Sequence, residues 1–189
     1  MSGTRDVPLP LIAFTGRFQP FHRQHLEMVR HALRLAERVV IGVTNPEDRP
    51  REQHPSSAHR HLAEANPLSF AQRRQLIEAA LQADGIAVSQ WEVIAFPLDG
   101  SEHWSSLIPP GTPQLVRVFS AWEREKVRRF AAAGYPPVIL EGDAASRLSA
   151  SAVRQALRDT RRVPGSVPPG ARELLAGWLE PLAGGCHGG

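Results

Sequence analysis

The chain has 189 residues and 42% hydrophobic content, enough for one domain with a buried core. No apolar run approaches the ~20 residues that cross a bilayer, and residues 1–8 lack the apolar segment of a signal peptide. We therefore expect a cytoplasmic protein without a membrane partner. The net charge of +3 is too small to indicate a nucleic-acid surface. Arginine supplies 21 of the 22 basic residues and Lys126 the last, a bias also typical of a GC-rich genome.

Strand and helix patterns alternate along the chain. Short runs rich in β-branched residues predict strands, and apolar residues spaced three and four apart predict helices. The expected elements are a strand over 9–15, a helix over 25–37, a strand over 38–44, a helix over 69–83, strands over 91–96 and 115–120, a helix over 122–133, a strand over 137–141, and helices over 149–158 and 171–179.

This order predicts an α/β fold. Continuous apolar strands separated by helices indicate a parallel sheet of about five strands with helices on both faces. Ligands of such sheets bind beyond the carboxyl ends of the strands, at the switch point. We expect one domain over residues 9–182, a tail over 1–8, and a flexible glycine-rich tail over 183–189 that holds the single cysteine, Cys186.

Residues 47–66 form a long polar stretch with two prolines. Loops of this length are often lids, so we expect it to cover the active-site face. Its three histidines, His54, His59 and His61, raise the question of a metal site. No cysteine or carboxylate pattern supports one, and we predict no protein-ligated metal.

Residues 16–26 carry the clearest functional pattern. The expected first strand runs into Gly16-Arg17-Phe18, and His22 and His25 follow where a helix begins. Side chains three apart share one helix face, and in the first turn this face also presents free N–H groups and the positive end of the helix dipole. Such a site suits a chain of phosphates. The alternative is a pair of half-buried histidines that only begin a helix.

This segment resembles the signature of nucleotidylyltransferases with a split HxGH motif, and specifically the archaeal-type nicotinamide mononucleotide (NMN) adenylyltransferases. It matches their pattern at ten of eleven positions, with Gln24 in place of a glycine. Residues 147–154 resemble the second motif of that family, Ile-Ser-x-Thr-x-x-Arg, and residues 66–77 resemble its Asn-Pro-Phe-Thr helix start. The resemblance covers roughly residues 9–165 and implies a Rossmann-like doubly wound sheet.

The resemblance also implies the chemistry. An acceptor oxygen attacks the α-phosphorus of a nucleoside triphosphate, CTP or ATP, and pyrophosphate leaves. Mg²⁺ is expected to bind mainly through the triphosphate, with water as its other ligands. The implied catalytic residues are His22, His25 and Arg154. The implied nucleotide and phosphate contacts are Gly16, Arg17, Phe18, Gln24, Ser149 and Ser151.

Three departures from the family pattern fall on substrate contacts. Gln24 takes space and adds an amide that could crowd a purine and pair with a pyrimidine. Ser101 stands for the asparagine of an Asn-x-x-Trp segment that binds nicotinamide, while Trp104 is kept, either for that contact or as core. Trp122 ends a Ser-Ala-Trp segment where the family has Ser-Gly-Asn. Ser101, Trp104 and Trp122 are therefore the predicted acceptor contacts.

We interpret this pattern as retained chemistry with altered substrates. It favours an enzyme that uses CTP to activate a small phosphonate or phosphate, as in natural-product (antibiotic) biosynthesis, over an ordinary NAD-forming adenylyltransferase. A nucleotide-binding regulator without turnover and a nucleic-acid-binding module are the remaining alternatives. The latter lacks interleaved aromatic residues. Homo-oligomerisation stays open.

Overall fold

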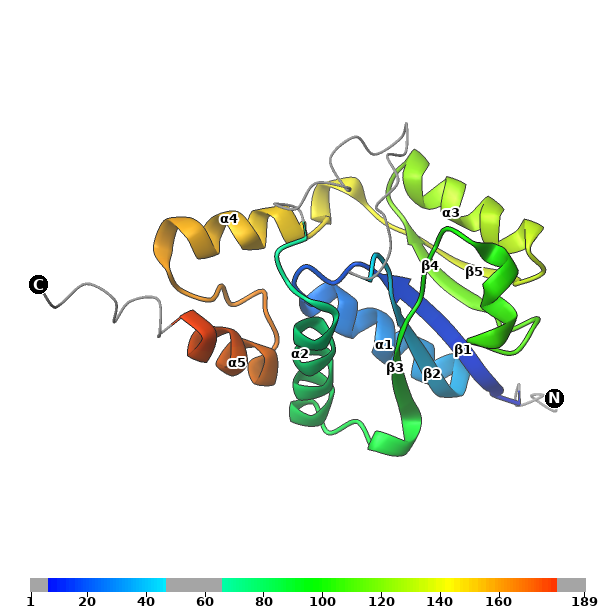
Figure 1. Ribbon diagram of the computed structural model, residues 1–189, viewed down its shortest axis with the longest axis horizontal. Coiled ribbons are helices and arrows are strands. Elements are labelled where there is room, and N and C mark those ends of the chain that lie inside the picture. The colour runs from blue at the N-terminus through cyan, green and yellow to red at the C-terminus, as the bar shows by residue number, and fades with distance from the viewer. Residues whose placement is uncertain (1–6, 47–65, 180–189) are drawn as a thin grey trace, which may run out of the picture.

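The computed structural model describes residues 7–46 and 66–179. Five strands form one sheet of order β3-β2-β1-β4-β5, and every neighbouring pair is parallel (Figure 1). The strands are β1 (Leu9–Gly16), β2 (Ala36–Val43), β3 (Trp91–Ala95), β4 (Gln114–Val118) and β5 (Pro137–Glu141). The predicted α/β fold with a five-stranded parallel sheet is confirmed.

Helices follow the strands in the predicted alternation. They are α1 (Arg23–Leu35), α2 (Phe70–Ala83), α3 (Ala121–Ala132), α4 (Ala150–Thr160) and α5 (Pro169–Leu179). The described residues also include the short 3₁₀ turns η2 (Val88–Gln90), η3 (Ser101–Ser106) and η4 (Ala144–Ser146). Within the described ranges, no helix is long and apolar enough to cross a membrane.

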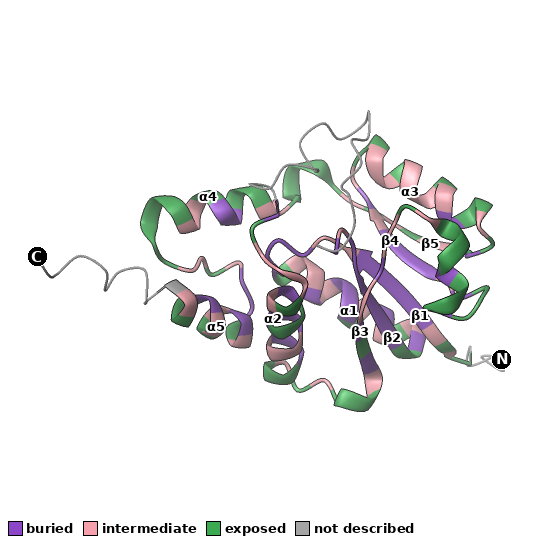
Figure 2. Cartoon of the chain, in the orientation of Figure 1, coloured by how far each residue is buried: buried purple, intermediate pink, exposed green. Residues whose placement is uncertain are grey.

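The sheet buries both of its faces. Alternate residues of a strand point to opposite faces, so Ile12 and Phe14 join the core under α1 and α2, whereas Ala13 joins the core under η3 and α3. Figure 2 shows the result, with β1 and β2 largely buried between the two helical layers. The predicted helix layers on both faces are therefore confirmed.

Most element bounds agree with the prediction to within two residues, and the differences have local causes. The first helix ends at Leu35 rather than 37, because Ala36 is extended (φ −140°, ψ 157°) and pairs with Leu9 as the first residue of β2. The predicted cap of α2 is confirmed: the N–H of Gln72 donates to Ser69 Oγ at 3.0 Å, and the N–H of Ser69 donates to Gln72 Oε1 at 2.9 Å.

The chain reverses its winding direction between β1 and β4. From β1 the connections through α1 and α2 lead to β2 and β3 on one side, and from β4 the connection through α3 leads to β5 on the other. β1 and β4 pair at Ala13–Gln114 and Phe14–Leu115 and then diverge. This is the switch point, where a ligand site is expected. The predicted lid over 47–66 lies, apart from Asn66, outside the described residues, as do the predicted tail over 183–189 and most of the tail over 1–8.

Candidate active site

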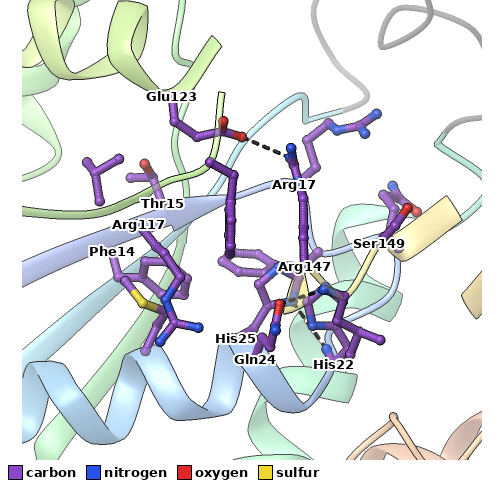
Figure 3. A pocket seen from close by; sticks show the side chains of 18 of the residues that line it. Phe14, Thr15, Arg17, His22, Gln24, His25, Arg117, Glu123, Arg147 and Ser149 are labelled. Carbon is purple, nitrogen blue, oxygen red and sulfur yellow. Dashed lines mark hydrogen bonds and ion pairs between the residues drawn. The ribbon is translucent and has the colours of Figure 1, made fainter. Parts of the chain in front are cut away.

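A cavity of about 440 Å³ opens at the switch point, beyond the carboxyl ends of β1 and β4. Its walls come from the end of β1, the first turns of α1 and α4, the end of β4 and the first half of α3. Figure 3 shows His22 and Ser149 on one side of this cavity, Phe14 and Arg117 on the other, and His25 between them. The two sequence motifs, more than a hundred residues apart, thus meet at one site.

The turn after β1 is shaped by aromatic packing. Phe18 is 1% exposed, has a positive φ of 52°, and lies with its ring against Phe14, Phe21 and His25. A Cβ on Gly16 would come within 2.8 Å of the Phe18 ring, so this close approach requires glycine. Gly16 and Phe18, two of the predicted nucleotide contacts, line the cavity, and they also fix the turn that carries Arg17, a further lining residue.

His22 and His25 are brought together in the first turn of α1. Their ring centroids lie 3.5 Å apart in a stacked arrangement, and His22 is 4% exposed. The backbone N–H of His22 donates to Nδ1 of His25 at 3.2 Å, which assigns the proton of a neutral His25 ring to Nε2. Nδ1 of His22 is buried and has no hydrogen-bond partner among the described residues. The pair therefore has ring atoms to offer a ligand.

The surroundings keep both imidazoles neutral. Burial lowers the pKa of His22 to about 4. Burial also holds the pKa of His25 well below its usual range, and the nearby charges of His22, Lys126 and Arg117 act in the same direction. A neutral ring that donates from Nε2 can hydrogen-bond a phosphate oxygen without first gaining a proton.

The second motif forms the start of α4. Ser149 is the residue before the helix, and its Oγ accepts from the N–H of Ser151 at 3.1 Å. Arg154, 9% exposed, donates from Nη1 to the carbonyl of Gln19 at 2.7 Å and from Nη2 to Oγ of Ser151 at 3.1 Å. Burial lowers the pKa of Arg154 below its usual value, which does not discharge it at neutral pH. Ser149, Ser151 and Arg154, the predicted phosphate contacts, line the cavity, and Arg154 also joins α4 to the loop before α1.

Gln24 connects the two motifs directly. Its Nε2 donates to the carbonyl of Ser146 at 2.6 Å, and its Oε1 accepts from the N–H of Leu148 at 2.8 Å. Gln24 lines the cavity, but both amide atoms are bonded to the loop before α4. The expectation of an amide that is available to a pyrimidine edge is not supported.

The predicted acceptor contacts separate in space. Trp122 lines the cavity from α3. Trp104 is 0% exposed, packs among Phe96, Phe130 and Tyr135, and donates from Nε1 to the carbonyl of Pro97 at 2.8 Å. The core alternative therefore holds for Trp104, and its assignment as an acceptor contact is corrected. Ser101 is exposed at the start of η3 and, like Trp104, is not among the described residues that line this cavity.

Four further charged residues line the cavity and were not predicted: Arg117, Glu123, Lys126 and Arg147. Lys126 Nζ donates to the carbonyl of Thr15 at 2.6 Å, and Arg147 Nη2 donates to Glu123 Oε1 at 2.9 Å. Two signals pointed to this group: Lys126 is the only lysine of the chain, and Arg117 is a charged residue within a predicted, otherwise apolar strand. Neither signal fixes which side chains face a ligand.

The donor set bears on the expected magnesium. The cavity lining is rich in arginine and histidine, and its one carboxylate among the described residues, Glu123, is ion-paired with Arg147. Within the same part of the chain, no group of three metal-ligating side chains occurs. This set does not fit a metal cage made by the protein, and it fits a Mg²⁺ that arrives on a triphosphate.

Comparison with known proteins identifies the family. The family model described as cytidylyltransferase-like matches residues 13–156. The phosphonoformate cytidylyltransferase of Streptomyces viridochromogenes is 27% identical over 160 residues, covering 85% of this chain and 87% of that protein. The nicotinamide-nucleotide adenylyltransferase of Thermococcus sibiricus is 23% identical over 163 residues, covering 86% and 81%.

A solved structure supports the fold. The bifunctional NMN adenylyltransferase/ADP ribose pyrophosphatase of Francisella tularensis superimposes with a TM-score of 0.64 at 22% identity. The match covers 91% of this chain and 50% of that one, so this chain spans about half of the bifunctional protein. Family model, relatives and fold agree with the two motifs around the cavity: the chain belongs to the cytidylyltransferase-like family and is a nucleotidyltransferase.

Proposed function

We propose that the protein transfers a cytidylyl group from CTP to a small phosphonate or phosphate acceptor and releases pyrophosphate. The observation that carries this proposal is the meeting of the stacked histidines with Ser149 and Arg154 at the switch-point cavity. A phosphonoformate cytidylyltransferase that matches most of the chain supports the choice of nucleotide and acceptor.

In this mechanism an oxygen of the acceptor forms a new bond to the α-phosphorus, and the bond from that phosphorus to the bridging oxygen of the β-phosphate breaks. The electron pair leaves with pyrophosphate, so no group of the enzyme is modified. His25 donates from Nε2 to an oxygen of the α-phosphate and His22 lies beside it, where negative charge grows in the transition state. Ser149 and Arg154 hold the β- and γ-phosphates that leave.

Magnesium, carried on the triphosphate, would neutralise part of the phosphate charge. Arg17 lies on the same side of the cavity as Ser149 and adds a further cation there (Figure 3). Catalysis of this kind depends on positioning and on charge stabilisation rather than on a nucleophile of the enzyme.

The decisive experiment is a matrix of the four nucleoside triphosphates against phosphonoformate, simple alkylphosphonates, NMN and nicotinate mononucleotide, read by pyrophosphate release. We expect the highest kcat/KM for CTP with a phosphonate, and loss of the signal in His25→Ala. Pyrophosphate release with ATP and NMN above all other pairs would overturn the proposal.

That outcome would establish NAD formation, the second candidate. The ten matched positions of the first motif and the archaeal relative favour it. The burial of Trp104 and the position of Ser101 away from the cavity speak against it, because they remove the two predicted nicotinamide contacts. Turnover with any pair would exclude a regulator that only binds nucleotide.

A further inference from the structure

Arg117 differs from Arg147 and Arg154, two other arginines of the cavity, in its hydrogen bonding. Arg154 donates to the carbonyl of Gln19 and to Ser151, and Arg147 donates to Glu123 and lies over the Phe119 ring. The side chain of Arg117 makes no hydrogen bond within the described residues. Its one ion-pair contact there is long, with Nη1 3.6 Å from Glu27 Oε2. Its side chain is nevertheless only 23% exposed.

A partly buried arginine side chain without hydrogen bonds at a ligand cavity indicates a ligand contact. Burying a charged group costs free energy unless its donors are satisfied. The planar guanidinium offers two parallel N–H donors in a fixed fork, which match two adjacent acceptor atoms. The ligand group that Arg117 takes should therefore present two acceptors side by side.

The neighbours of Arg117 indicate what carries those acceptors. Leu115 lies two residues before Arg117 on the same face of β4, and Phe14 is its register partner on β1. Met28 of α1 lines the same cavity, one residue beyond Glu27. Figure 3 shows Arg117 beside Phe14, across the cavity from Ser149 and His22. These apolar walls suit a flat heteroaromatic ring.

We infer that Arg117 is the specificity residue that reads the nucleobase and selects cytosine. This inference rests on the proposed function, since it assigns the base of the nucleotide to the Phe14 side of the cavity. The N3 and O2 atoms of cytosine are adjacent acceptors and accept both N–H donors of the fork. The neighbouring exocyclic amine is a donor, and Glu27 beside Arg117 can accept from it.

Other bases match this fork less well. In adenine the acceptors N1 and N7 each lie next to the exocyclic amine, which is a donor. One of the two N–H groups of the guanidinium fork would therefore face a donor. Uracil has an N–H at position 3 and fails in the same way. Guanine does offer adjacent acceptors at O6 and N7, but on a larger ring. The expected order of binding is therefore CTP first, GTP next, and ATP and UTP last.

The test measures binding of the four triphosphates by calorimetry with wild type, Arg117→Gln and Arg117→Lys, together with kcat/KM for CTP and ATP. Both variants should lose about 5- to 150-fold in CTP affinity, the range that one bidentate side chain–base contact distinguishes. Affinity for ATP should change by less than about threefold. Lysine should not rescue, because an ammonium lacks the fork.

Arg38→Gln is the matched control. Arg38 also lies on a strand and also has one long ion pair, 4.0 Å to Glu92, but it stands near the amino end of β2, away from the cavity. This variant should bind all four nucleotides as wild type does. Melting curves of all variants show whether each is folded.

The outcomes separate this inference from the proposed function. If CTP binds in an Arg117-dependent way but no acceptor yields pyrophosphate, the proposed reaction fails and the base assignment stands. If wild type turns over CTP and the ratio of CTP to ATP affinity is unchanged in Arg117→Gln, the base assignment is overturned and the reaction stands. Equal loss of all four nucleotides would also overturn it, because Arg117 would then bind phosphate or support the fold.

Discussion

The two helix starts that meet at the cavity are held in different ways. The first turn of α1 belongs to the core, where His22 is 4% exposed and the helix buries Leu26, Met28, Val29 and Ala32. α4 buries only Val153 and Arg154, and Figure 2 shows most of its surface exposed. Packing therefore fixes the histidines, while α4 depends more on individual polar contacts.

The polar contacts that hold the start of α4 join it to α1, to the loop before α1, or to α3. Gln24 bonds the loop before α4, Arg154 donates to the carbonyl of Gln19, and Arg147 is ion-paired with Glu123. Side-chain hydrogen bonds of this kind contribute about 0.5–1.5 kcal/mol each, far less than a buried helix face. The difference teaches that the two halves of the proposed site are anchored unequally: the α1 turn, proposed to act at the α-phosphate, is held by core packing, and the start of α4, proposed to hold the leaving pyrophosphate, is held by a few polar contacts.

The largest effect on turnover should follow from removing the imidazole donors in the first turn of α1. His22→Ala and His25→Ala should each lower kcat by about 10²–10³, the loss expected for one donor to the transition state, roughly 3–4 kcal/mol. Circular dichroism should show an intact fold. His103→Ala, which changes a histidine with a side chain 58% exposed, is the control for pyrophosphate release. Near-normal turnover in both cavity variants would remove the proposed role.

Substitutions of Arg154 test the role of the start of α4. Arg154→Ala should raise the KM for the triphosphate and lower kcat, by about 10- to 100-fold together in kcat/KM, because it loses a phosphate contact and the link to Gln19. Arg154→Lys should recover only part, since lysine lacks the fork. Arg158→Ala, one turn later on the exposed face, should behave as wild type. Full recovery by lysine would mean that charge alone matters at this position.

The buried histidine also predicts a pH dependence of stability. The pKa of His22 falls from about 6.5 unfolded to about 4 folded, so between these values the unfolded chain binds more protons. The free energy of unfolding should decrease as pH falls through this window, by up to ~1.4 kcal/mol per pH unit for one group. The neighbouring His25, whose pKa is also lowered, and the cations Lys126 and Arg117 act in the same direction.

Urea unfolding at pH 7, 6 and 5 measures this slope. His22→Gln should show a shallower slope than wild type, and His103→Gln an unchanged one. Identical slopes in wild type and His22→Gln would show that His22 titrates in the folded protein as it does in the unfolded chain.

The smallest effect should come from Gln24. Gln24→Ala and Gln24→Gly each lose two hydrogen bonds to the loop before α4, and should raise the KM for CTP and ATP alike by about 2- to 10-fold. Gln155→Ala, which removes two hydrogen bonds within the exposed face of α4, one to Asp159 and one from Arg158, is the control. A shift of preference from CTP to ATP in Gln24→Gly would instead restore a direct contact between Gln24 and the base.

The sequence predicted what depends on local pattern. Apolar strand runs gave the sheet, the Ser69–Gln72 cap gave the start of α2, and His22, His25, Ser149 and Arg154 were assigned to one site that the fold does assemble. These features need only spacing along the chain and the rule that ligands bind at the switch point.

The features that the sequence analysis missed depend on contacts between residues that are far apart in the chain. The partners of Gln24 lie more than a hundred residues away, so nothing near position 24 shows that its amide is bonded. Trp104 is as compatible with a binding surface as with a core until Phe96 and Phe130 are seen around it. Arg117 joins the cavity because β4 is placed next to β1, an arrangement that the order of elements alone does not specify.

The short pairing of β1 with β4 has a consequence for how the domain responds to its ligand. β1 pairs with β2 from Leu9 to Gly16, but with β4 only at Ala13–Gln114 and Phe14–Leu115. The sheet is thus two subsheets with few backbone bonds between them, and the cavity lies across that boundary. A nucleotide that touches both sides adds the cross-links that the backbone lacks, and its binding free energy adds to the cohesion of the domain. In the proposed function, the cavity that binds the nucleotide is therefore also the place where the nucleotide strengthens the sheet.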